Sequence, residues 1–150
     1  MAQRTPKILI ALISVSIVLS IIFTTCGGIC PLMTKNMTQL FRSYRMVNDV
    51  SFVSITVNPE TDTPTVLMDY AKKFDANMDQ WHFLTGSREA ITDIAVHGFK
   101  LGSIEEPIFH SAKFVLVDRQ LHIRGYYDGT ENAELSKLFK DVATLLNERH

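Results

Sequence analysis

Two cysteines four positions apart, Cys26 and Cys30, give this chain its clearest potential for chemistry, and Pro31 follows directly in the string FTTCGGICP. Proline suits the first turn of a helix, because that turn leaves its N–H groups unpaired and the ring fixes a helical φ. The sequence therefore predicts a helix that begins at Pro31 and presents both sulfurs near its N-terminus. There the helix dipole and the unpaired N–H groups lower the pKa of a thiol. We expect thiolates, which bind soft metals and attack disulfides.

The chain contains two cysteines in all, and this count shapes the interpretation of the pair. One local pair does not make a disulfide scaffold, so a redox couple or a metal site is the more natural use. Gly27 and Gly28 leave the intervening loop free to wrap, so that the sulfurs can converge on each other or on one ion. The plainer alternative is that both cysteines are small buried hydrophobic side chains.

Length and composition limit the remaining choices. A chain of 150 residues with a hydrophobic fraction of 46% is typical of one globular domain, with or without a single membrane segment. The formal net charge is −1, and the lysines and arginines are scattered among acidic residues. The chain therefore lacks the basic surface that nucleic-acid binding requires, and we expect no nucleic-acid partner.

The uncharged run over residues 8–23 allows two structures. Arg4 and Lys7 precede it without an acidic residue, which is typical of a signal anchor with a cytoplasmic N-terminus and an exported domain. The run is slightly shorter than the about 17–25 residues that usually span a membrane. Alternatively, residues 15–24 are rich in β-branched side chains and form a central strand covered on both faces. In that case the cysteines lie at its C-terminal end, where open α/β sheets place ligands.

The rest of the chain alternates between helix and strand patterns. Apolar residues recur three and four apart over residues 31–47 and 133–147, which predicts two amphipathic helices. Another helix is predicted over residues 87–96. Alternating and β-branched patterns predict strands, the last two joined as an antiparallel hairpin: residues 50–57, 81–85, 112–117 and 121–127.

Several polar and sulfur-containing residues have ordinary structural interpretations. Asp62 or Thr63 can cap a helix that has Pro64 in its first turn, so Asp62 is interpreted as a cap more than as a ligand. Met33 and Met37 are expected to lie in the core, since they share the apolar face of the helix over residues 31–47. A metal-binding role is not expected of four histidines: His82, His97, His122 and His150.

Four separated strings resemble the characteristic blocks of the Sco/SenC family: FTTCGGICP, VNPETDTPTVLMDYAKKF, IFHSAKFVLVD and IRGYYDG. The resemblance extends from about residue 23 to the C-terminus. It implies an α/β, thioredoxin-like fold, a three-layer α/β/α sandwich with an inserted strand–helix unit and a C-terminal β-hairpin plus helix. The expected division is a membrane-anchor-like segment over residues 1–23, or alternatively the first strand of the sheet, followed by a Sco-like domain over residues 24–150.

The resemblance also implies a function. Sco/SenC proteins are membrane-anchored copper chaperones that help to assemble the binuclear copper centre of cytochrome c oxidase. Their two motif cysteines and one histidine bind copper, and these map onto Cys26, Cys30 and His110. The implied partners are the oxidase subunit with the copper centre, other copper chaperones or thiol reductases, and the membrane. The implied location is the exported side of a bacterial plasma membrane more than the mitochondrial inner membrane.

This chain departs from the family at its N-terminus. Family members carry a further stretch, including an early hairpin, between the anchor and the strand that leads to the cysteines, whereas here the apolar run adjoins the motif. Three explanations are open: a truncated or mispredicted gene, a run that is the first strand, or a shortened member whose site lies against the bilayer. We favour the first as a working hypothesis, because one run cannot be both a membrane helix and a central strand.

Two thiolates and an imidazole form a soft, low-coordinate ligand set. Such a set suits Cu(I), and it holds Cu(II) if a further nitrogen or oxygen ligand completes a tetragonal site. The ligand thiols must lose protons, so copper binding should weaken at low pH. The alternative function is that of a thiol–disulfide oxidoreductase, in which Cys26 and Cys30 act as a catalytic redox pair without a metal. Dependence on His110 distinguishes the two functions.

Overall fold

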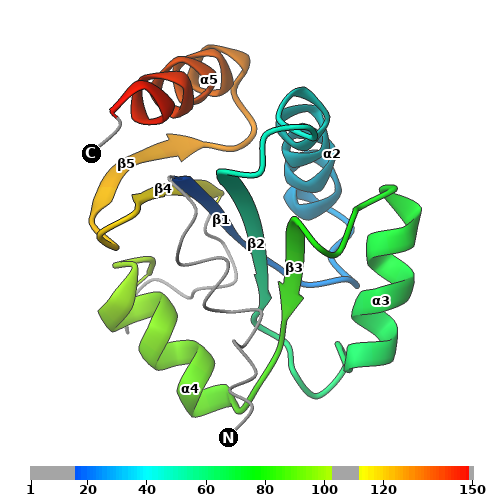
Figure 1. Ribbon diagram of the computed structural model, residues 1–150. Helices are drawn as coiled ribbons and strands as arrows, with labels where there is room; N and C mark the ends of the chain where they lie inside the picture. The colour runs from blue at the N-terminus through cyan, green and yellow to red at the C-terminus, as the bar shows by residue number, and fades with distance from the viewer. Residues whose placement is uncertain (1–15, 103–111, 149–150) are drawn as a thin grey trace, which may run out of the picture.

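A five-stranded mixed sheet with helices on both faces forms the protein in the computed structural model, which describes residues 16–102 and 112–148 (Figure 1). The strands are β1 (Ser16–Ile22), β2 (Val50–Thr56), β3 (Trp81–Leu84), β4 (Lys113–Asp118) and β5 (Ile123–Asp128). The helices are α2 (Ile29–Ser43), α3 (Pro64–Lys73), α4 (Arg88–Thr92), which continues into the π-helix η1 (Asp93–Gly98), and α5 (Asn132–Asn147).

The strand order in the sheet is β3-β2-β1-β4-β5. β1 pairs parallel with β2 and antiparallel with β4, so that Leu19 lies opposite Val53 on one side and Val115 on the other. β3 extends the parallel half, and β5 forms a hairpin with β4. This arrangement confirms the predicted thioredoxin-like fold with an inserted strand–helix unit and a C-terminal hairpin plus helix.

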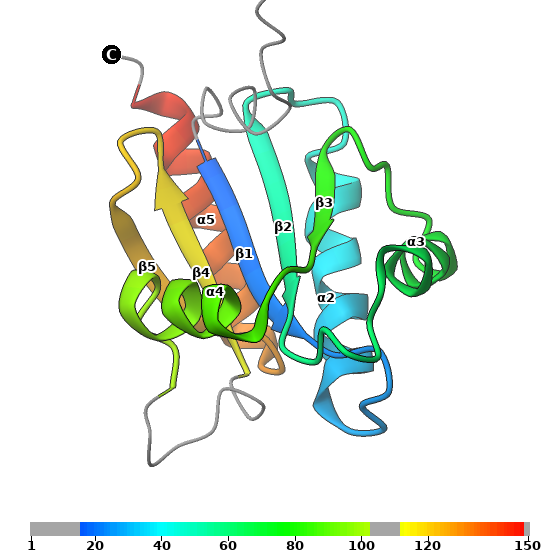
Figure 2. The ribbon, with the colours of Figure 1, turned by 90° about the horizontal axis from the view of Figure 1, so that it is seen from below.

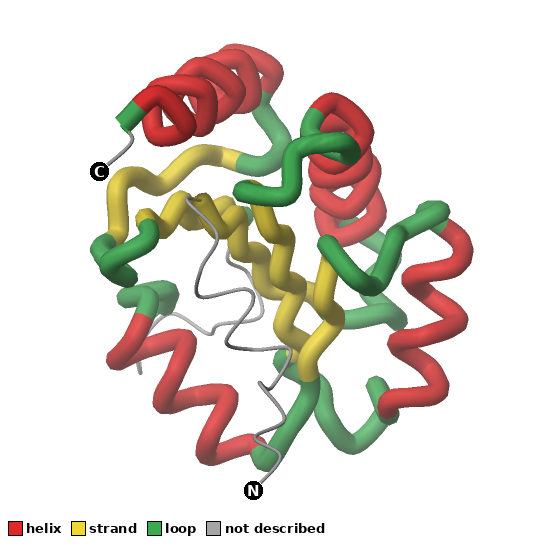
Figure 3. Tube along the Cα trace, viewed as in Figure 1, coloured by secondary structure: helices red, strands yellow, loops and turns green. Residues whose placement is uncertain are grey.

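Each face of the sheet has its own hydrophobic core. α2 and α5 cover one face and α4 covers the other, as Figures 2 and 3 show. Alternate residues of β1 divide between the cores: Val18 packs under α2 and α5, and Leu19 packs under α4. Met33 and Met37 are each 1% exposed on the inner face of α2, which confirms that they are core residues.

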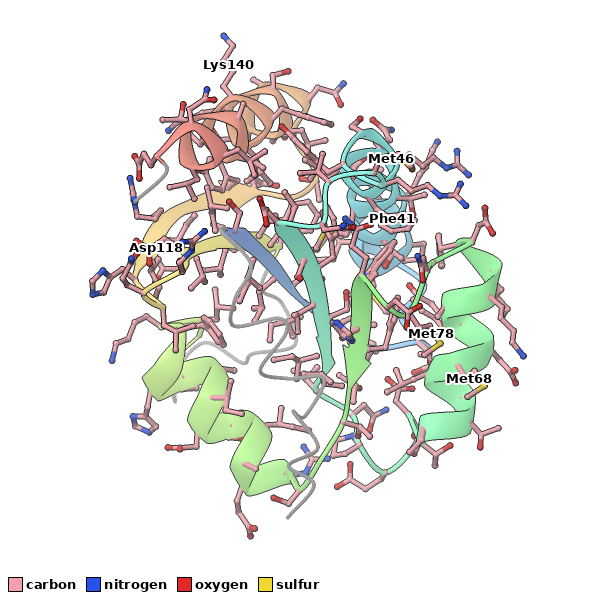
Figure 4. All side chains as sticks on the ribbon, viewed as in Figure 1. Phe41, Met46, Met68, Met78, Asp118 and Lys140 are labelled. Atoms are coloured by element: carbon pink, nitrogen blue, oxygen red, sulfur yellow. The ribbon has the colours of Figure 1, made fainter. Side chains whose placement is uncertain are left out.

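Trp81 is the largest side chain in the core under α2, and it is completely buried. Its ring stacks on Phe83 with centroids 5.1 Å apart and contacts Phe41 at 5.6 Å; Figure 4 shows Phe41 between α2 and the sheet. The indole Nε1–H donates to Ser54 Oγ at 3.0 Å, and Ser54 Oγ is hydrogen-bonded to Ser20 Oγ at 2.9 Å. One ring therefore joins the helix layer to the polar groups of the two central strands.

The second half of the apolar run is a strand. Ser16–Ile22 is buried along its whole length and forms the centre of the sheet. Of the two structures that the run allowed, the strand is the one observed for these residues, and the rest of the run lies outside the described residues. In the parts of the chain that the structure describes, no helix is long and apolar enough to cross a membrane.

The starts of two helices, α2 and α3, test the predictions made from proline and the cap candidates. α2 begins at Ile29, two residues before Pro31, so Cys30 lies within its first turn. α3 is capped by Thr63, whose hydroxyl accepts a hydrogen bond from the Val66 N–H; this confirms one of the two predicted cap candidates, and the interpretation of Asp62 as the cap is wrong. In both helices proline still lies in the first turn, where it displaces no intrahelical hydrogen bond.

Candidate dithiol metal centre

The loop from β1 to α2 brings the two cysteines together at one end of the sheet. Cys26 lies in this loop and is partly exposed, whereas Cys30 lies in the first turn of α2 and is 3% exposed. The Cys26 N–H donates to the Phe23 carbonyl at 3.2 Å, which turns the chain back toward the helix. The two thiols are within hydrogen-bonding reach of each other. The loop therefore brings the two sulfurs close enough to interact.

The Cys26 sulfur lies over the N-terminus of α2. Burial opposes its ionisation, but the N–H groups of Cys30, Gly28 and Ile29 and the Cys30 thiol outweigh this effect and lower the pKa of Cys26 below 9.0. A Cβ atom added at Gly28 would meet the Cys26 sulfur at 3.9 Å, so the loop passes close beneath it. The expected stabilisation of a thiolate by a helix N-terminus is thus found at Cys26.

The expectation of a lowered pKa is wrong for Cys30. Burial raises the pKa of the Cys30 thiol to about 12, and the negative charges of Cys26 and Asp62 act in the same direction. A hydrogen bond from the Phe23 backbone opposes the change without reversing it. The pair therefore consists of an accessible sulfur that ionises readily and a buried one that keeps its proton.

Alkylation should separate the two thiols in the reduced chain. Because Cys26 has a lowered pKa, its rate with iodoacetamide should reach half its maximum below pH 9. The raised pKa of Cys30 leaves its thiol protonated at neutral pH, and the protonated thiol is a poor nucleophile. Peptide mapping by mass spectrometry at short times should find the label on Cys26. Chain unfolded in urea is the control and should react at both sites, and early labelling of Cys30 in the folded chain would contradict the assignment.

Asp62 is a buried carboxylate next to this site, whereas the sequence favoured a helix cap at this position and the family resemblance allowed a supporting role beside the ligands. It is completely buried and accepts hydrogen bonds from the Thr24 N–H at 3.0 Å, the Thr24 hydroxyl, and the Thr56 hydroxyl at 2.7 Å. The available signal was Thr63, because a second cap candidate next to Asp62 leaves the aspartate free for another use. The side chain therefore joins the loop that carries Cys26 to the end of β2.

Tyr70 on α3 borders the buried side of the pair and was not singled out from the sequence. Its hydroxyl is 2.8 Å from Thr34 Oγ1, one helical turn after Cys30. Burial raises the pKa of Tyr70, and the charges of Cys30 and Cys26 add to the effect. The phenol therefore stays protonated and closes the α3 side of the site.

The third predicted ligand, His110, lies outside the residues that the structure describes. His110 belongs to residues 103–111, and His150 also falls outside the described residues. Within residues 16–102 and 112–148, no group of three His, Cys, Asp or Glu side chains is placed to hold a metal ion. His97 lies at the end of η1, and His122 is 3.7 Å from Asp118 in the hairpin, so neither joins the cysteines.

The fold and the asymmetric cysteine pair define a thioredoxin-like protein with a dithiol at the start of its first described helix. The SCO1/SenC family profile matches residues 12–147. This chain therefore belongs to the SCO1/SenC family. Among curated proteins it is similar to the SCO1 protein homolog of Bacillus subtilis (strain 168), with 35% identity over 127 residues, 81% of this chain and 66% of that protein. The chain thus spans slightly less than two thirds of the length of this relative.

Solved structures of the family have the same fold. A SCO1/SenC family lipoprotein from Bacillus anthracis str. Ames is 30% identical, with a TM-score of 0.78 over 90% of this chain and 83% of that one. BsSco, described by its disulfide switch and as a member of the Sco family of cytochrome c oxidase assembly proteins, is 32% identical, with a TM-score of 0.77 over 92% and 84%. A copper-bound ScoI from Arabidopsis thaliana, 23% identical with a TM-score of 0.71 over 92% and 87%, shares the fold.

Proposed function

We propose that this chain binds copper through Cys26, Cys30 and His110 and delivers it for assembly of the copper centre of cytochrome c oxidase. The observation that carries the proposal is the convergence of two thiols at the N-terminus of α2, one accessible and one buried. Sulfur donors suit Cu(I), and three protein ligands leave a position through which the metal can pass to a recipient. Membership of a family linked to oxidase assembly supports the recipient.

The described residues fit copper as cargo at the sulfur side of the site. The N–H groups over Cys26 favour its thiolate, and thiolates are the form that binds soft metals. Cys30 must release its proton on binding, so loading should release protons and weaken as pH falls. The partners we propose are the oxidase subunit that receives the copper, and other copper chaperones or thiol reductases that reload or reduce the pair.

The proposed location is the exported side of a bacterial membrane, where such a recipient would be met. Arg4 and Lys7 before the apolar run support an inward N-terminus by the positive-inside rule. The lipoprotein from Bacillus anthracis supports membrane attachment in this family. Ser16–Ile22, the part of the apolar run that the structure describes, is the central strand of the folded domain.

Copper stoichiometry of the purified, reduced chain tests the proposal, with Cu(I) and Cu(II) offered separately. We expect about one tightly held copper per chain, lost in Cys26→Ser and in His110→Ala. His122→Ala is the matched control, because His122 is an exposed hairpin residue and should leave the stoichiometry unchanged. A folded wild-type chain that binds no copper would overturn the function, and full binding by His110→Ala would overturn the ligand assignment.

The asymmetry of the two thiols favours a second candidate function, that of a thiol–disulfide oxidoreductase. The Cys26 thiolate would attack a partner disulfide, forming a mixed disulfide and releasing one partner thiolate. Cys30, after losing its proton, would attack the Cys26 sulfur, which forms the intramolecular disulfide and releases the second partner thiolate. Two electrons pass from the pair to the partner. This route uses no histidine, so His110→Ala should keep disulfide reduction while losing copper.

A further inference from the structure

Asp62 holds two segments at the same end of the sheet. Thr56 is the last residue of β2 and lies opposite Ile22, the last residue of β1. Asp62 takes the Thr56 hydroxyl with one oxygen, Oδ2, which also accepts the Thr24 N–H, while Oδ1 accepts the Thr24 hydroxyl. Figure 2 shows the β1–α2 and β2–α3 loops side by side at this end of the sheet. Both carboxylate oxygens are thus used to fasten Thr24.

The space beside the two glycines of the loop beyond Thr24 is open in the part of the chain that the structure describes. No described atom lies within 4 Å of a Cβ added at Gly27, and for Gly28 the one described neighbour within that distance is the Cys26 sulfur. The backbone turn from Cys26 N–H to the Phe23 carbonyl is local to the loop. Among the side-chain hydrogen bonds of the described residues, those from Thr24 to Asp62 therefore connect the start of this loop to a residue 38 positions later in the chain.

A carboxylate that is completely buried requires a reason to be there. Burying it is costly unless hydrogen bonds satisfy it, and capping of α3 is already done by Thr63. The three donors that satisfy Asp62 come from the end of β2 and the residue two positions before Cys26. Two of the three hydrogen bonds that satisfy Asp62 therefore come from Thr24, at the start of the loop that carries Cys26.

We infer that Asp62 is a positioning residue of the cysteine pair: by fastening Thr24, it holds Cys26 where its sulfur can close on Cys30. The inference rests on the proposed function, because it concerns the same pair. Its consequence is thermodynamic. An intramolecular disulfide is favoured in proportion to how often the two sulfurs meet, so a loosened loop makes the disulfide less stable.

The reaction that reports this property needs no copper. The reduced chain and oxidised glutathione exchange, so that Cys26 and Cys30 lose two protons and two electrons and form one S–S bond. The glutathione disulfide takes up the two protons and the two electrons, and its S–S bond breaks to give two molecules of glutathione. The equilibrium constant in glutathione buffers of known ratio, measured by trapping free thiols and counting them by mass spectrometry, gives the stability of the disulfide.

Thr24→Val tests the inference, because it removes the hydroxyl donor to Asp62 and keeps the branched shape. We expect about a tenfold lower equilibrium constant for disulfide formation, equivalent to about 30 mV for a two-electron couple. Thr24→Ser restores a hydroxyl and should restore the wild-type value. Tyr127→Phe is the matched control: it removes a hydroxyl donor to another carboxylate, Asp141 Oδ2 at 2.6 Å, away from the cysteines, and should leave the constant unchanged.

The outcomes separate this inference from the proposed function. If folded Thr24→Val has the same equilibrium constant for disulfide formation as the wild type, the positioning role is overturned. The proposed function would still stand. An equal loss in Tyr127→Phe would also overturn the positioning role, since the effect would then follow global stability. A wild-type chain that forms no disulfide would overturn the inference together with the redox alternative, while copper stoichiometry would still judge the chaperone function.

Discussion

Replacing Cys30 with serine is expected to weaken Cu(I) binding by at least about a hundredfold. Loss of a residue that only supports a metal ligand costs up to about a hundredfold in affinity. Cys30 is a proposed ligand itself, so its loss should cost at least as much. Cys30 supplies the buried sulfur of the pair. A serine hydroxyl is a hard donor and suits Cu(I) poorly. Competition with a chromophoric Cu(I) chelator measures the affinity. The same variant should form no intramolecular disulfide, which thiol counting after mild oxidation checks.

The control for this experiment is a second buried change in the same helix. Thr38→Ser removes one methyl group from α2, where Thr38 is 7% exposed and bonds the Thr34 carbonyl. It should keep the wild-type affinity for Cu(I). Circular dichroism must show that Cys30→Ser is folded, because a polar group in the place of a buried thiol costs about 1–3 kcal/mol. A folded Cys30→Ser chain that binds Cu(I) like the wild type would contradict the proposed ligand set.

Trp81→Ala is expected to lower the free energy of unfolding by about 3–5 kcal/mol, the range for truncating a large buried aromatic side chain. The change opens a cavity beside Phe83 and Phe41 and removes the donor to Ser54 Oγ. Urea unfolding followed by circular dichroism measures the loss. Fluorescence is unsuitable, since Trp81 is the single tryptophan of the chain.

Trp81→Phe is the matched variant for this prediction. It keeps an aromatic ring in the core and loses mainly the indole hydrogen bond, so its cost should be clearly smaller than that of alanine. In urea-free buffer, any Trp81→Ala chain that remains folded should keep its copper affinity, because Trp81 packs under α2 and not against the cysteine loop. Equal losses from alanine and phenylalanine would show that the hydrogen bond, and not the packing, carries the stability.

Periodicity and turn chemistry predicted most of the fold, and the differences have physical causes. Proline identifies the first turn of a helix and not its first residue, because several N–H groups of that turn are unpaired; α2 therefore begins at Ile29 and not at Pro31. The helix predicted over residues 87–96 is an α-helix that changes to a π-helix and ends at Gly98. The Phe99 N–H bonds to the Ile94 carbonyl five residues back, a spacing that sequence periodicity does not reveal.

The sequence predicted which cysteines form the candidate site, but it did not predict that their pKa values differ. The spacing of Cys26 and Cys30 was sufficient to predict that the sulfurs meet at a helix N-terminus. The raised pKa of Cys30 depends on burial by segments distant in sequence, which a local motif does not contain. Asp62 illustrates the same limit, because its partners Thr24 and Thr56 are 38 and 6 residues away. His110 as a ligand remains a prediction.

The position of β1 between β2 and β4 also determines when the site can form during synthesis. β1 and the cysteines that follow it leave the ribosome early, but the antiparallel partner of Ser16 is Asp118, about a hundred residues later in the chain. Long-range pairing of this kind forms slowly, since a large loop must close first. Until β4 has emerged, one edge of β1 lacks its partner. The dithiol should therefore acquire its final environment after most of the chain has been made, and copper loading should follow translation.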